Sequence, residues 1–231
     1  MSLPEPYYSH GGIVIYHGDC RDILPHVTAD VVVTDPPYGM NWPCDNRRFC
    51  GGSVESQARR PKNPRHYPPV VGDDQPFDPS PWMGFSGVVL WGANHYGQRL
   101  PVGTTLVWIK RLDPAFGSFL SDAEVAWMKG GHGVYCYRDL SMQGDTTTRT
   151  HPTQKPVPLM RWCIGLMPEG VILDPFMGSG TTLVAAKQLG RKAIGIEIEE
   201  RYCEIAVKRL QQEVLPFVAS EPEPVQANML D

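Results

Sequence analysis

A glycine-rich segment in the last third of the chain has the residue types of a nucleoside site. Asp174-Pro-Phe-Met-Gly-Ser-Gly-Thr-Thr182 joins a predicted strand to a predicted helix, so a ligand can approach its backbone near the free N–H groups of a helix start. Glu197 follows Gly180 by 17 residues, close to the roughly 20-residue spacing of an acid that binds ribose hydroxyls. Leu183 replaces the third glycine of the dinucleotide fingerprint. The spacing favours adenosine over a dinucleotide; a turn needed only for packing is the alternative.

A second segment, Asp35-Pro36-Pro37-Tyr38, follows the apolar run Val-Val-Val-Thr. From average residue usage, this tetrapeptide arises by chance in a chain of this length with a probability on the order of one in a thousand. Proline cannot extend a central strand, so the segment is expected to form a stiff turn at the sheet edge. Such a turn holds a carboxylate, the Pro36 carbonyl and an aromatic face within a few ångströms. An ordinary proline loop with Tyr38 packed on the fold is the alternative.

Acidic residues follow four of the predicted strands, and these residues are Asp19, Asp35, Asp174 and Glu197. In open α/β sheets, ligands bind outside the carboxyl ends of the strands, close to the point where the strand order reverses. An acid after a strand can also simply cap the next helix. Four such acids together favour a ligand site at this edge of the sheet.

The elements that position these residues are predicted from short apolar runs. The runs are β-branched and mostly continuous, as in strands covered on both faces and therefore in a largely parallel sheet. They span residues 12–17, 30–34, 87–91, 104–109, 123–128, 171–173 and 193–196. Helices are predicted over 156–167, 181–189 and 199–214. Alternating strands and helices in the final third predict an α/β fold with a mostly parallel, doubly wound sheet.

The chain has 231 residues, enough for one sizeable domain with a small insertion. Its 21 Lys plus Arg face 25 Asp plus Glu, so contact with nucleic acid requires a local basic patch. The sequence contains neither the roughly 18-residue apolar stretch of a membrane span nor a recognisable signal peptide. Its six cysteines form no Cys-x-x-Cys pair and are expected to be reduced thiols. We therefore expect a cytoplasmic protein without a membrane partner.

Together the segments resemble the motifs of amino-directed DNA methyltransferases. These motifs are Asp35-Pro-Pro-Tyr38, Phe176-x-Gly178-x-Gly180, Gly18-Asp19-Cys20 and His151-Pro-Thr-Gln-Lys155-Pro156. Their order, with Asp-Pro-Pro-Tyr first, resembles the β class found in bacterial restriction-modification systems. The resemblance covers residues 12–39 and 86–214. It implies a Rossmann-like methyltransferase sheet with permuted motif order, S-adenosylmethionine as methyl donor, and adenine N6 or cytosine N4 of double-stranded DNA as acceptor.

The resemblance also implies how the turn at Asp35 acts. An exocyclic amine is a poor nucleophile because its lone pair is delocalised into the ring. The Asp35 carboxylate and the Pro36 carbonyl can accept its two N–H bonds and favour a pyramidal nitrogen, while Tyr38 can stack on the base. A base cannot reach this turn from inside a duplex and must be flipped out. Asp-Pro-Pro-Tyr usually accompanies adenine in the family, so adenine N6 is the expected acceptor and cytosine N4 the alternative.

The donor site implied by the resemblance draws on several strand ends. Its expected residues are Asp19 and Cys20 near the adenine edge, Glu197 on the ribose diol, His151 and Lys155 near the methionine end, and Asp174, Phe176, Gly178 and Gly180 in the glycine-rich turn. A solvated lysine is the alternative for Lys155, and a small buried residue is the alternative for Cys20.

A basic segment, residues 46–66, follows the Asp35 turn and has Glu55 as its single acid. Such a loop can neutralise DNA phosphates. The expected DNA contacts are Arg47, Arg48, Arg59, Arg60, Lys62 and Arg65. No metal site is expected, because the spacing of Cys44, Cys50 and His66 does not suit structural zinc. We expect residues 1–218 to form one methyltransferase domain with an inserted loop at 40–81, and residues 219–231 to form a disordered tail.

Residues 130–150, where the family normally places target recognition, are too few for an independent domain. Recognition could instead reside in residues 40–81 or require a second subunit, so a homodimer is one option. Two rival functions are a catalytically silent DNA-binding relative and a nicotinamide oxidoreductase. The intact Asp35–Tyr38 turn argues against the first rival, and Leu183 argues against the second.

Overall fold

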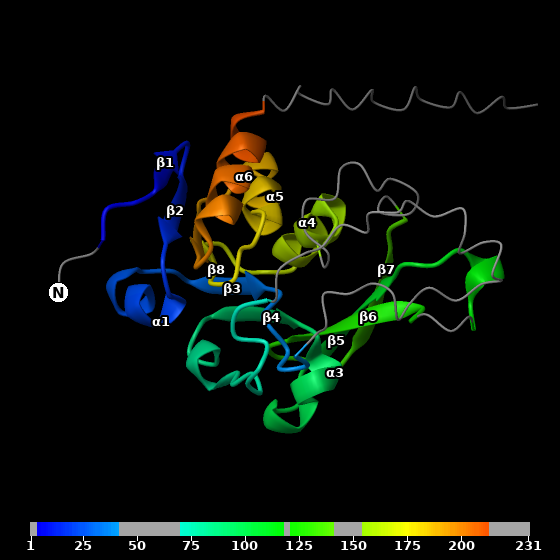
Figure 1. Cartoon of the computed structure of the whole chain (residues 1–231). Coiled ribbons are helices and arrows are strands. Elements are labelled where there is room, and N and C mark those ends of the chain that lie inside the picture. The colour runs from blue at the N-terminus through cyan, green and yellow to red at the C-terminus, as the bar shows by residue number, and fades with distance from the viewer. Residues whose placement is uncertain (1–3, 42–69, 118–120, 141–153, 213–231) are drawn as a thin grey trace, which may run out of the picture.

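The computed structural model describes residues 4–41, 70–117, 121–140 and 154–212, and within them the strands form one nine-stranded sheet (Figure 1). The spatial order is β1-β2-β9-β8-β3-β4-β6-β5-β7. The neighbours β2 (Ile13–His17), β9 (Ala193–Glu197), β8 (Ile172–Asp174), β3 (Val31–Thr34) and β4 (Gly87–Trp91) are all parallel. β1 (Tyr8–His10) and β6 (Ala123–Met128) run antiparallel to their neighbours. β5 (Thr104–Ile109) and β7 (Val134–Arg138) pair in parallel. The expected α/β fold with a mostly parallel sheet is confirmed.

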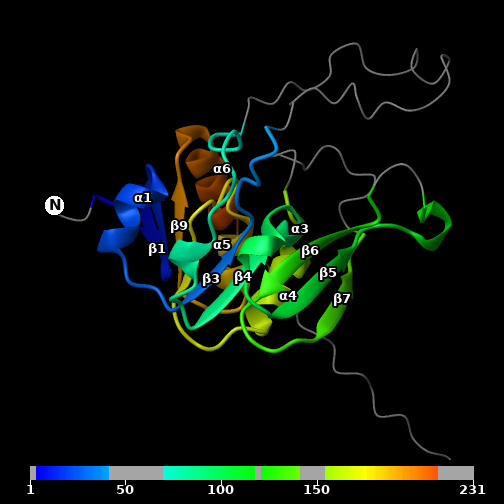
Figure 2. The same ribbon diagram turned by 90° about the horizontal axis from the view of Figure 1, so that it is seen from below.

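Helices cover both faces of the sheet. α4 (Val157–Gly165), α5 (Thr181–Gln188) and α6 (Glu200–Gln211) pack on one face around a core that includes Trp91, Leu159 and Leu183 (Figure 1). The short helices α1 (Cys20–Ile23) and α3 (Ala93–Tyr96) lie on the opposite face, which Figure 2 shows from below. The 3₁₀ turns η1 (Leu24–His26), η3 (Ser80–Trp82), η4 (Gly97–Arg99) and η5 (Asp113–Ala115) complete the described elements. This double covering explains why the central strands are continuous apolar runs.

The predicted strands agree closely with the observed ones, and β4, β5 and β6 have the predicted bounds. Two edge strands, β1 and β7, were not predicted. Four of the five β7 residues are exposed, so this strand lacks the apolar run that marked the others. Of the expected insertion at 40–81, the structure describes residues 40–41 and 70–81, and Asp73 and Phe77 in the second stretch are buried.

The strand order reverses between β3 and β8. The chain passes from β3 to β4 on one side of this point, and from β8 to β9 on the other. Asp35 directly follows β3 and Asp174 is the last residue of β8, and the two strands are joined where the Thr34 hydroxyl donates to Asp174 Oδ1 at 2.7 Å. The two motifs that the sequence suggested as acceptor and donor sites therefore leave the sheet side by side, at the position where α/β folds bind ligands.

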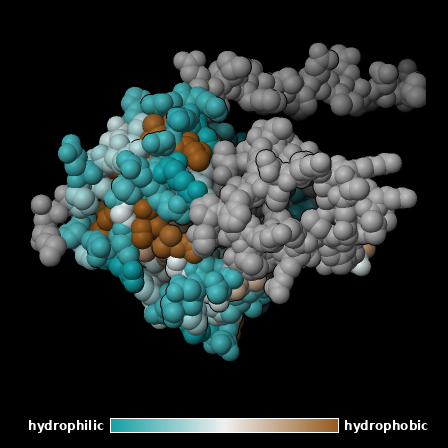
Figure 3. All heavy atoms as spheres, viewed as in Figure 1, coloured by the Kyte–Doolittle hydropathy of each residue, from teal (hydrophilic) through white to brown (hydrophobic). Residues whose placement is uncertain are grey.

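Hydrophilic residues predominate among the described residues on the face shown in Figure 3, and hydrophobic residues gather there in small separate areas. Within the described residues, no helix has the length and apolar character needed to cross a membrane.

Candidate active site

The Asp35 carboxylate lies at the centre of a cluster of polar side chains at the switch point. Its Oδ1 accepts a hydrogen bond from the Tyr38 hydroxyl, and its Oδ2 accepts one from Lys155 Nζ at 2.6 Å. Burial raises the pKa of Asp35 above its ordinary value, the Lys155 ammonium offsets part of this rise, and Glu124 adds to it. Each carboxylate oxygen has two lone pairs, so Asp35 can accept further hydrogen bonds while keeping these partners. The site thus holds a charged acceptor in a largely buried place.

Lys155 is 4% exposed and uses its ammonium group for three contacts. Nζ lies 2.6 Å from Asp35 Oδ2, 3.0 Å from Glu124 Oε2 and 3.3 Å from the Tyr38 hydroxyl. It also lies 5.7 Å from the centre of the Trp91 ring. Burial alone would lower the pKa of Lys155, but Asp35 and Glu124 outweigh burial and hold it well above its ordinary value. Lys155 is therefore a buried cation fixed against Asp35, which excludes the solvated lysine considered from the sequence.

The Asp35 turn is held from its far side by Asp73, a residue that the sequence reasoning missed. Asp73 is 6% exposed, and its Oδ1 accepts hydrogen bonds from the backbone N–H groups of Tyr38 at 3.0 Å, Gly39 at 2.9 Å and Met40 at 3.2 Å. Its backbone carbonyl accepts from the N–H of Asn41 at 2.7 Å. One buried carboxylate therefore satisfies three consecutive amides that have left the strand ladder.

We expect Asp73→Ala to destabilise the protein by about 1–3 kcal/mol, because buried amide groups lose their acceptor. The rate of the chemical step at Asp35 should fall as well, because the turn that carries Asp35 and Tyr38 loses its support. Asp73→Asn, which keeps a neutral acceptor, should be milder. The matched control is Asp74→Ala, since Asp74 is the exposed neighbour. Urea denaturation and activity measured on all three variants check this, and equal behaviour of the two alanine variants would contradict it.

The glycine-rich turn after β8 is joined to the end of β9 by Glu197. Glu197 Oε2 accepts from the Gly178 N–H at 2.9 Å, and Oε1 accepts from the Glu199 N–H at 2.9 Å. Burial raises the pKa of Glu197, and these backbone hydrogen bonds oppose the rise. One lone pair of each oxygen remains available for hydroxyl groups of a ligand.

The same turn is held at its beginning by Asp174 and from α6 by Arg209. Asp174 Oδ1 accepts from the Phe176 N–H at 3.2 Å, and burial raises the pKa of Asp174 to about 6. Arg209 of α6 donates to the Ser179 carbonyl at 2.5 Å, the Ser179 hydroxyl at 3.0 Å and the Thr181 hydroxyl at 3.1 Å. Asp174 therefore fixes the start of the turn. Arg209 stabilises the turn from α6, and no local sequence pattern predicts this role.

The turn fits an adenosine-containing cofactor on two observations. Gly178 has a φ of +49° and an added Cβ would meet no atom within 4 Å, so this stretch of backbone is open to a ligand. Gly180 has a φ of +76° and its Cβ position lies 2.7 Å from the Ala206 Cβ, so only glycine lets the turn lie this close to α6. An open backbone beside the Glu197 carboxylate is what a ribose diol and its adjoining chain require.

Asp19 and Cys20 stand at the end of the neighbouring strand β2. The Asp19 carboxylate caps α1 through the Arg21 N–H at 2.9 Å and pairs with the Arg21 guanidinium at 2.5 Å. Burial raises the pKa of the half-buried Cys20 thiol to about 11, and the Asp19 charge adds to this rise. The structure thus gives Asp19 a capping role, while its expected role toward adenine remains a prediction.

Several expected site residues lie outside the described part of the chain. These are His151, the basic residues Arg47, Arg48, Arg59, Arg60, Lys62 and Arg65, and the cysteines and histidine considered for zinc, Cys44, Cys50 and His66. His95 of α3 stacks on Tyr38, with ring centres 4.8 Å apart and an interplanar angle of 11°. A base that stacks on Tyr38 must therefore use a part of the Tyr38 ring that His95 does not cover, or displace the exposed His95 ring.

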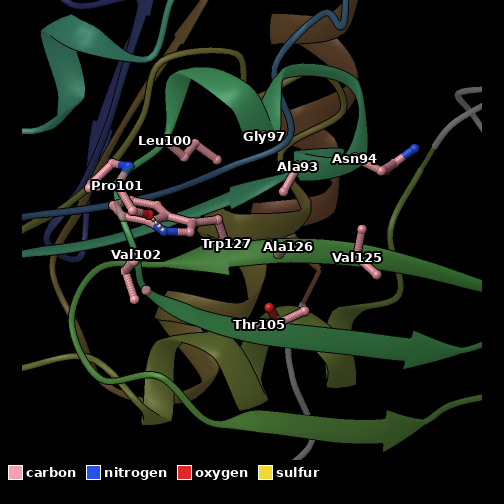
Figure 4. Close-up of a pocket in the computed structure, with 11 residues that line it drawn as sticks. Ala93, Asn94, Gly97, Leu100, Pro101, Val102, Thr105, Val125, Ala126 and Trp127 are labelled. Atoms are coloured by element: carbon pink, nitrogen blue, oxygen red, sulfur yellow. Dashed lines mark hydrogen bonds between the residues drawn. The ribbon is translucent and has the colours of Figure 1, made fainter.

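A cavity of about 340 Å³ lies next to this region but is separate from it. Ala93, Gly97 and Leu100 face Val125 and Trp127 across it, between α3, η4 and the strands β5 and β6 (Figure 4). Its lining contains neither the Asp35 turn nor the glycine-rich turn. It is therefore a groove beside α3 and distinct from the cluster around Asp35.

Comparison with known proteins shows the family to which this chain belongs. Residues 103–208 match the family model N6_N4_Mtase, which is described as DNA methylase. The putative methylase YubD of Escherichia coli (strain K12) is 48% identical over 202 residues, which are 84% of this chain and 88% of the relative. The chain belongs to the N6/N4 DNA methylase family. The expected family resemblance is thereby confirmed.

Solved structures of this family have the same fold. The M1.HpyAVI–SAM complex is 25% identical, with a TM-score of 0.50, and the match covers 86% of this chain and 99% of that chain. The cytosine-N4-specific PvuII DNA methyltransferase is 14% identical, with a TM-score of 0.58 and 91% and 90% of the two chains covered, and shows the shared fold. S-adenosylmethionine, the cofactor expected from the sequence, is thus the cofactor of the family. N6/N4 methylases act on an amino group of DNA, and the choice between adenine and cytosine is a finer question.

Proposed function

We propose that this protein is a site-specific DNA methyltransferase that transfers a methyl group from S-adenosylmethionine to adenine N6 of a base flipped out of double-stranded DNA. The observation that carries the proposal is the Asp35 carboxylate, held by Tyr38 and Lys155 at the switch point beside the glycine-rich turn. The proposed catalytic groups and the proposed cofactor site would meet there, as the function requires.

The glycine-rich turn and its neighbours would hold the cofactor. Glu197 would bind the ribose diol, Gly178 and Gly180 would give the cofactor access to the backbone, and Asp19 with Cys20 would border the adenine. His151 and Lys155 would lie toward the methionine end. When bound, S-adenosylmethionine supplies a methyl group made electrophilic by the sulfonium.

The protein's own residues would prepare the acceptor. Asp35 and the Pro36 carbonyl accept the two N–H bonds of the amine, and Pro37 keeps the turn rigid. Tyr38 offers its ring to the base. The amine becomes acidic only as it gains the methyl group, so Asp35 need accept its proton only at that stage. Orientation of the amine toward the cofactor then supplies most of the acceleration.

The basic segment is proposed as the main DNA contact. Its cations are Arg47, Arg48, Arg59, Arg60, Lys62 and Arg65. The chain carries a net charge of −4, so phosphate binding depends on such a local concentration of positive charge. The segment follows the Asp35 turn directly in the sequence, which supports contact with DNA around the flipped base.

Incubating the purified protein with methyl-labelled S-adenosylmethionine and varied DNA duplexes tests the proposal. After digestion of the DNA, N6-methyladenine is the expected labelled base. N4-methylcytosine alone would establish the alternative acceptor, which the shared N6/N4 family keeps open. DNA binding without any label in DNA would identify a silent relative, and label only in RNA or protein would also overturn the proposal.

A further inference from the structure

Two lysines and two acids form a continuous line of charge behind the Asp35 turn. Lys110 Nζ lies 2.7 Å from Glu124 Oε1, Glu124 Oε2 lies 3.0 Å from Lys155 Nζ, and Lys155 Nζ lies 2.6 Å from Asp35 Oδ2. The outer pair is more exposed than the inner pair, with 27% at Lys110 and 32% at Glu124 against 4% at Lys155 and 20% at Asp35. Glu124 is therefore the link between a partly exposed lysine and the buried pair.

The strand arrangement explains how Glu124 reaches this position. β6 begins beside the end of β5, where Glu124 pairs with Trp108, and the backbone N–H of Lys110 donates to the Asp122 carbonyl at 3.2 Å. Ala126 packs in the core that contains residues of α4, and Glu124 lies two residues earlier in β6, so both side chains are on the face of the sheet that α4 covers. Lys155 lies just before α4, so it meets Glu124 on that face.

The contacts of Lys155 show what Glu124 does. An ammonium group has three N–H donors, and those of Lys155 reach Asp35, Tyr38 and Glu124. Without Glu124, one donor of a buried cation would lose its acceptor, and among the described carboxylates Asp35 alone would pair with that cation. A carboxylate that alone neutralises a buried ammonium is a weak proton acceptor.

We infer that Glu124 is a positioning residue for methyl transfer, which holds the Lys155 ammonium in place and shares its charge so that Asp35 stays able to accept a proton. The inference rests on the proposed function. When the amino nitrogen forms its bond to the methyl carbon, the bond from that carbon to the sulfonium sulfur breaks and its electron pair stays on sulfur, which leaves as a neutral thioether. The nitrogen becomes cationic, and one of its N–H bonds then breaks. The proton forms an O–H bond with Asp35, so the nitrogen and the carboxylate both become neutral.

The electrostatic surroundings of Asp35 define the sign of the effect. Among the described residues, the charged or titratable groups that face it are Lys155, Glu124, Tyr38, Tyr96 and Asp174. Burial raises the pKa of Asp35, Lys155 lowers it and Glu124 raises it. Burial would raise the pKa of Glu124, but Lys155 and Lys110 outweigh burial and lower it to about 2, so Glu124 is charged throughout the useful pH range. Removing the Glu124 charge should therefore lower the pKa of Asp35, and weakening the hold of Lys110 on Glu124 should raise it.

Single-turnover methyl transfer, measured against pH with Glu124→Gln, Lys110→Met and Glu204→Gln, tests the inference. Asp35 can accept a proton only in its deprotonated form, so the rate should fall at pH values below the pKa of Asp35. Glu124→Gln should slow transfer by up to about 100-fold and move the acidic limb down by about one pH unit. Lys110→Met should move the same limb to higher pH, by a smaller amount than the shift for Glu124→Gln. Glu204, exposed on α6, is the matched control and should change neither.

A wild-type rate and pH profile for Glu124→Gln would overturn the inference, and so would shifts in the same direction for both variants. A purely structural role would slow transfer without opposite shifts. Thermal unfolding of each variant identifies misfolding, and if Glu124→Gln does not fold, the direction of the Lys110→Met shift decides. If the wild-type protein methylates no DNA, the proposed function fails as well. An active wild type with an unchanged Glu124→Gln profile overturns this inference alone.

Discussion

Asp35→Asn is expected to reduce methyl transfer to DNA by about 1000-fold, because a neutral amide cannot accept the proton that leaves the amino nitrogen. The substitution preserves the volume of the side chain and one oxygen acceptor for Lys155. Binding of S-adenosylmethionine should stay close to wild type, because the proposed contacts of its ribose lie at Glu197 and the glycine-rich turn. Single-turnover assays and calorimetric titration of the cofactor check the two expectations separately.

The control for Asp35→Asn is Asp74→Asn, an equivalent change at an exposed position. Thermal unfolding shows whether the buried Lys155 still allows the variant to fold. Turnover at the wild-type rate would remove Asp35 from the catalytic role. Loss of cofactor binding together with turnover would instead place Asp35 in the donor site.

A single methyl group at Gly92 should also impair the site severely. Gly92 precedes α3 with a φ of +76°, and a Cβ there would lie 2.5 Å from Cδ1 of Tyr38 and closer still to Cε1 and Cζ. Gly92→Ala therefore requires a strained backbone and a displaced Tyr38 ring. We expect a loss of about 1–3 kcal/mol of stability and a fall in the transfer rate of about 100-fold, because misplaced groups cost orientation.

Gly97→Ala is the matched control for this effect. Gly97 lies directly after α3 with a φ of −57°, and a Cβ there would meet no atom within 4 Å. Its alanine variant should keep the wild-type rate and gain up to about 1 kcal/mol of stability. Urea denaturation and single-turnover assays on both variants give the comparison. Equal rates for Gly92→Ala and Gly97→Ala would mean that the position of Tyr38 does not matter.

Much of the fold was predictable because the central strands are covered on both faces. Val31–Thr34 and Gly87–Trp91 are continuous buried runs, and such runs are a local signal. The edge strand Val134–Arg138 is exposed and has no buried apolar run, so its own sequence does not predict its pairing with β5. The same reasoning placed Asp35 and Asp174 at strand ends, and the reversal of the strand order brings these ends together.

The supporting residues were less accessible to sequence reasoning, because their contacts join distant parts of the chain. Asp73 lies 35 residues from Tyr38, whose amide it accepts, and no local pattern marks it. Lys155 contacts Asp35 across 120 residues. Glu124 offered a weak signal, since it is a charged residue within the otherwise apolar run Ala123–Met128. A charge inside a predicted strand therefore merits attention as a member of a buried ion pair.

The backbone N–H of Asn41 donates a 2.7 Å hydrogen bond to the Asp73 carbonyl, so the described chain before residue 42 and after residue 69 is joined beside the Asp35 turn. The Asp73 carboxylate also accepts from the N–H groups of Tyr38, Gly39 and Met40. Because both ends are fixed in this way, and because loop length changes the free energy of closure only slowly, we expect a change in the length of residues 42–69 to leave the register of β3 and the position of Asp35 unaltered.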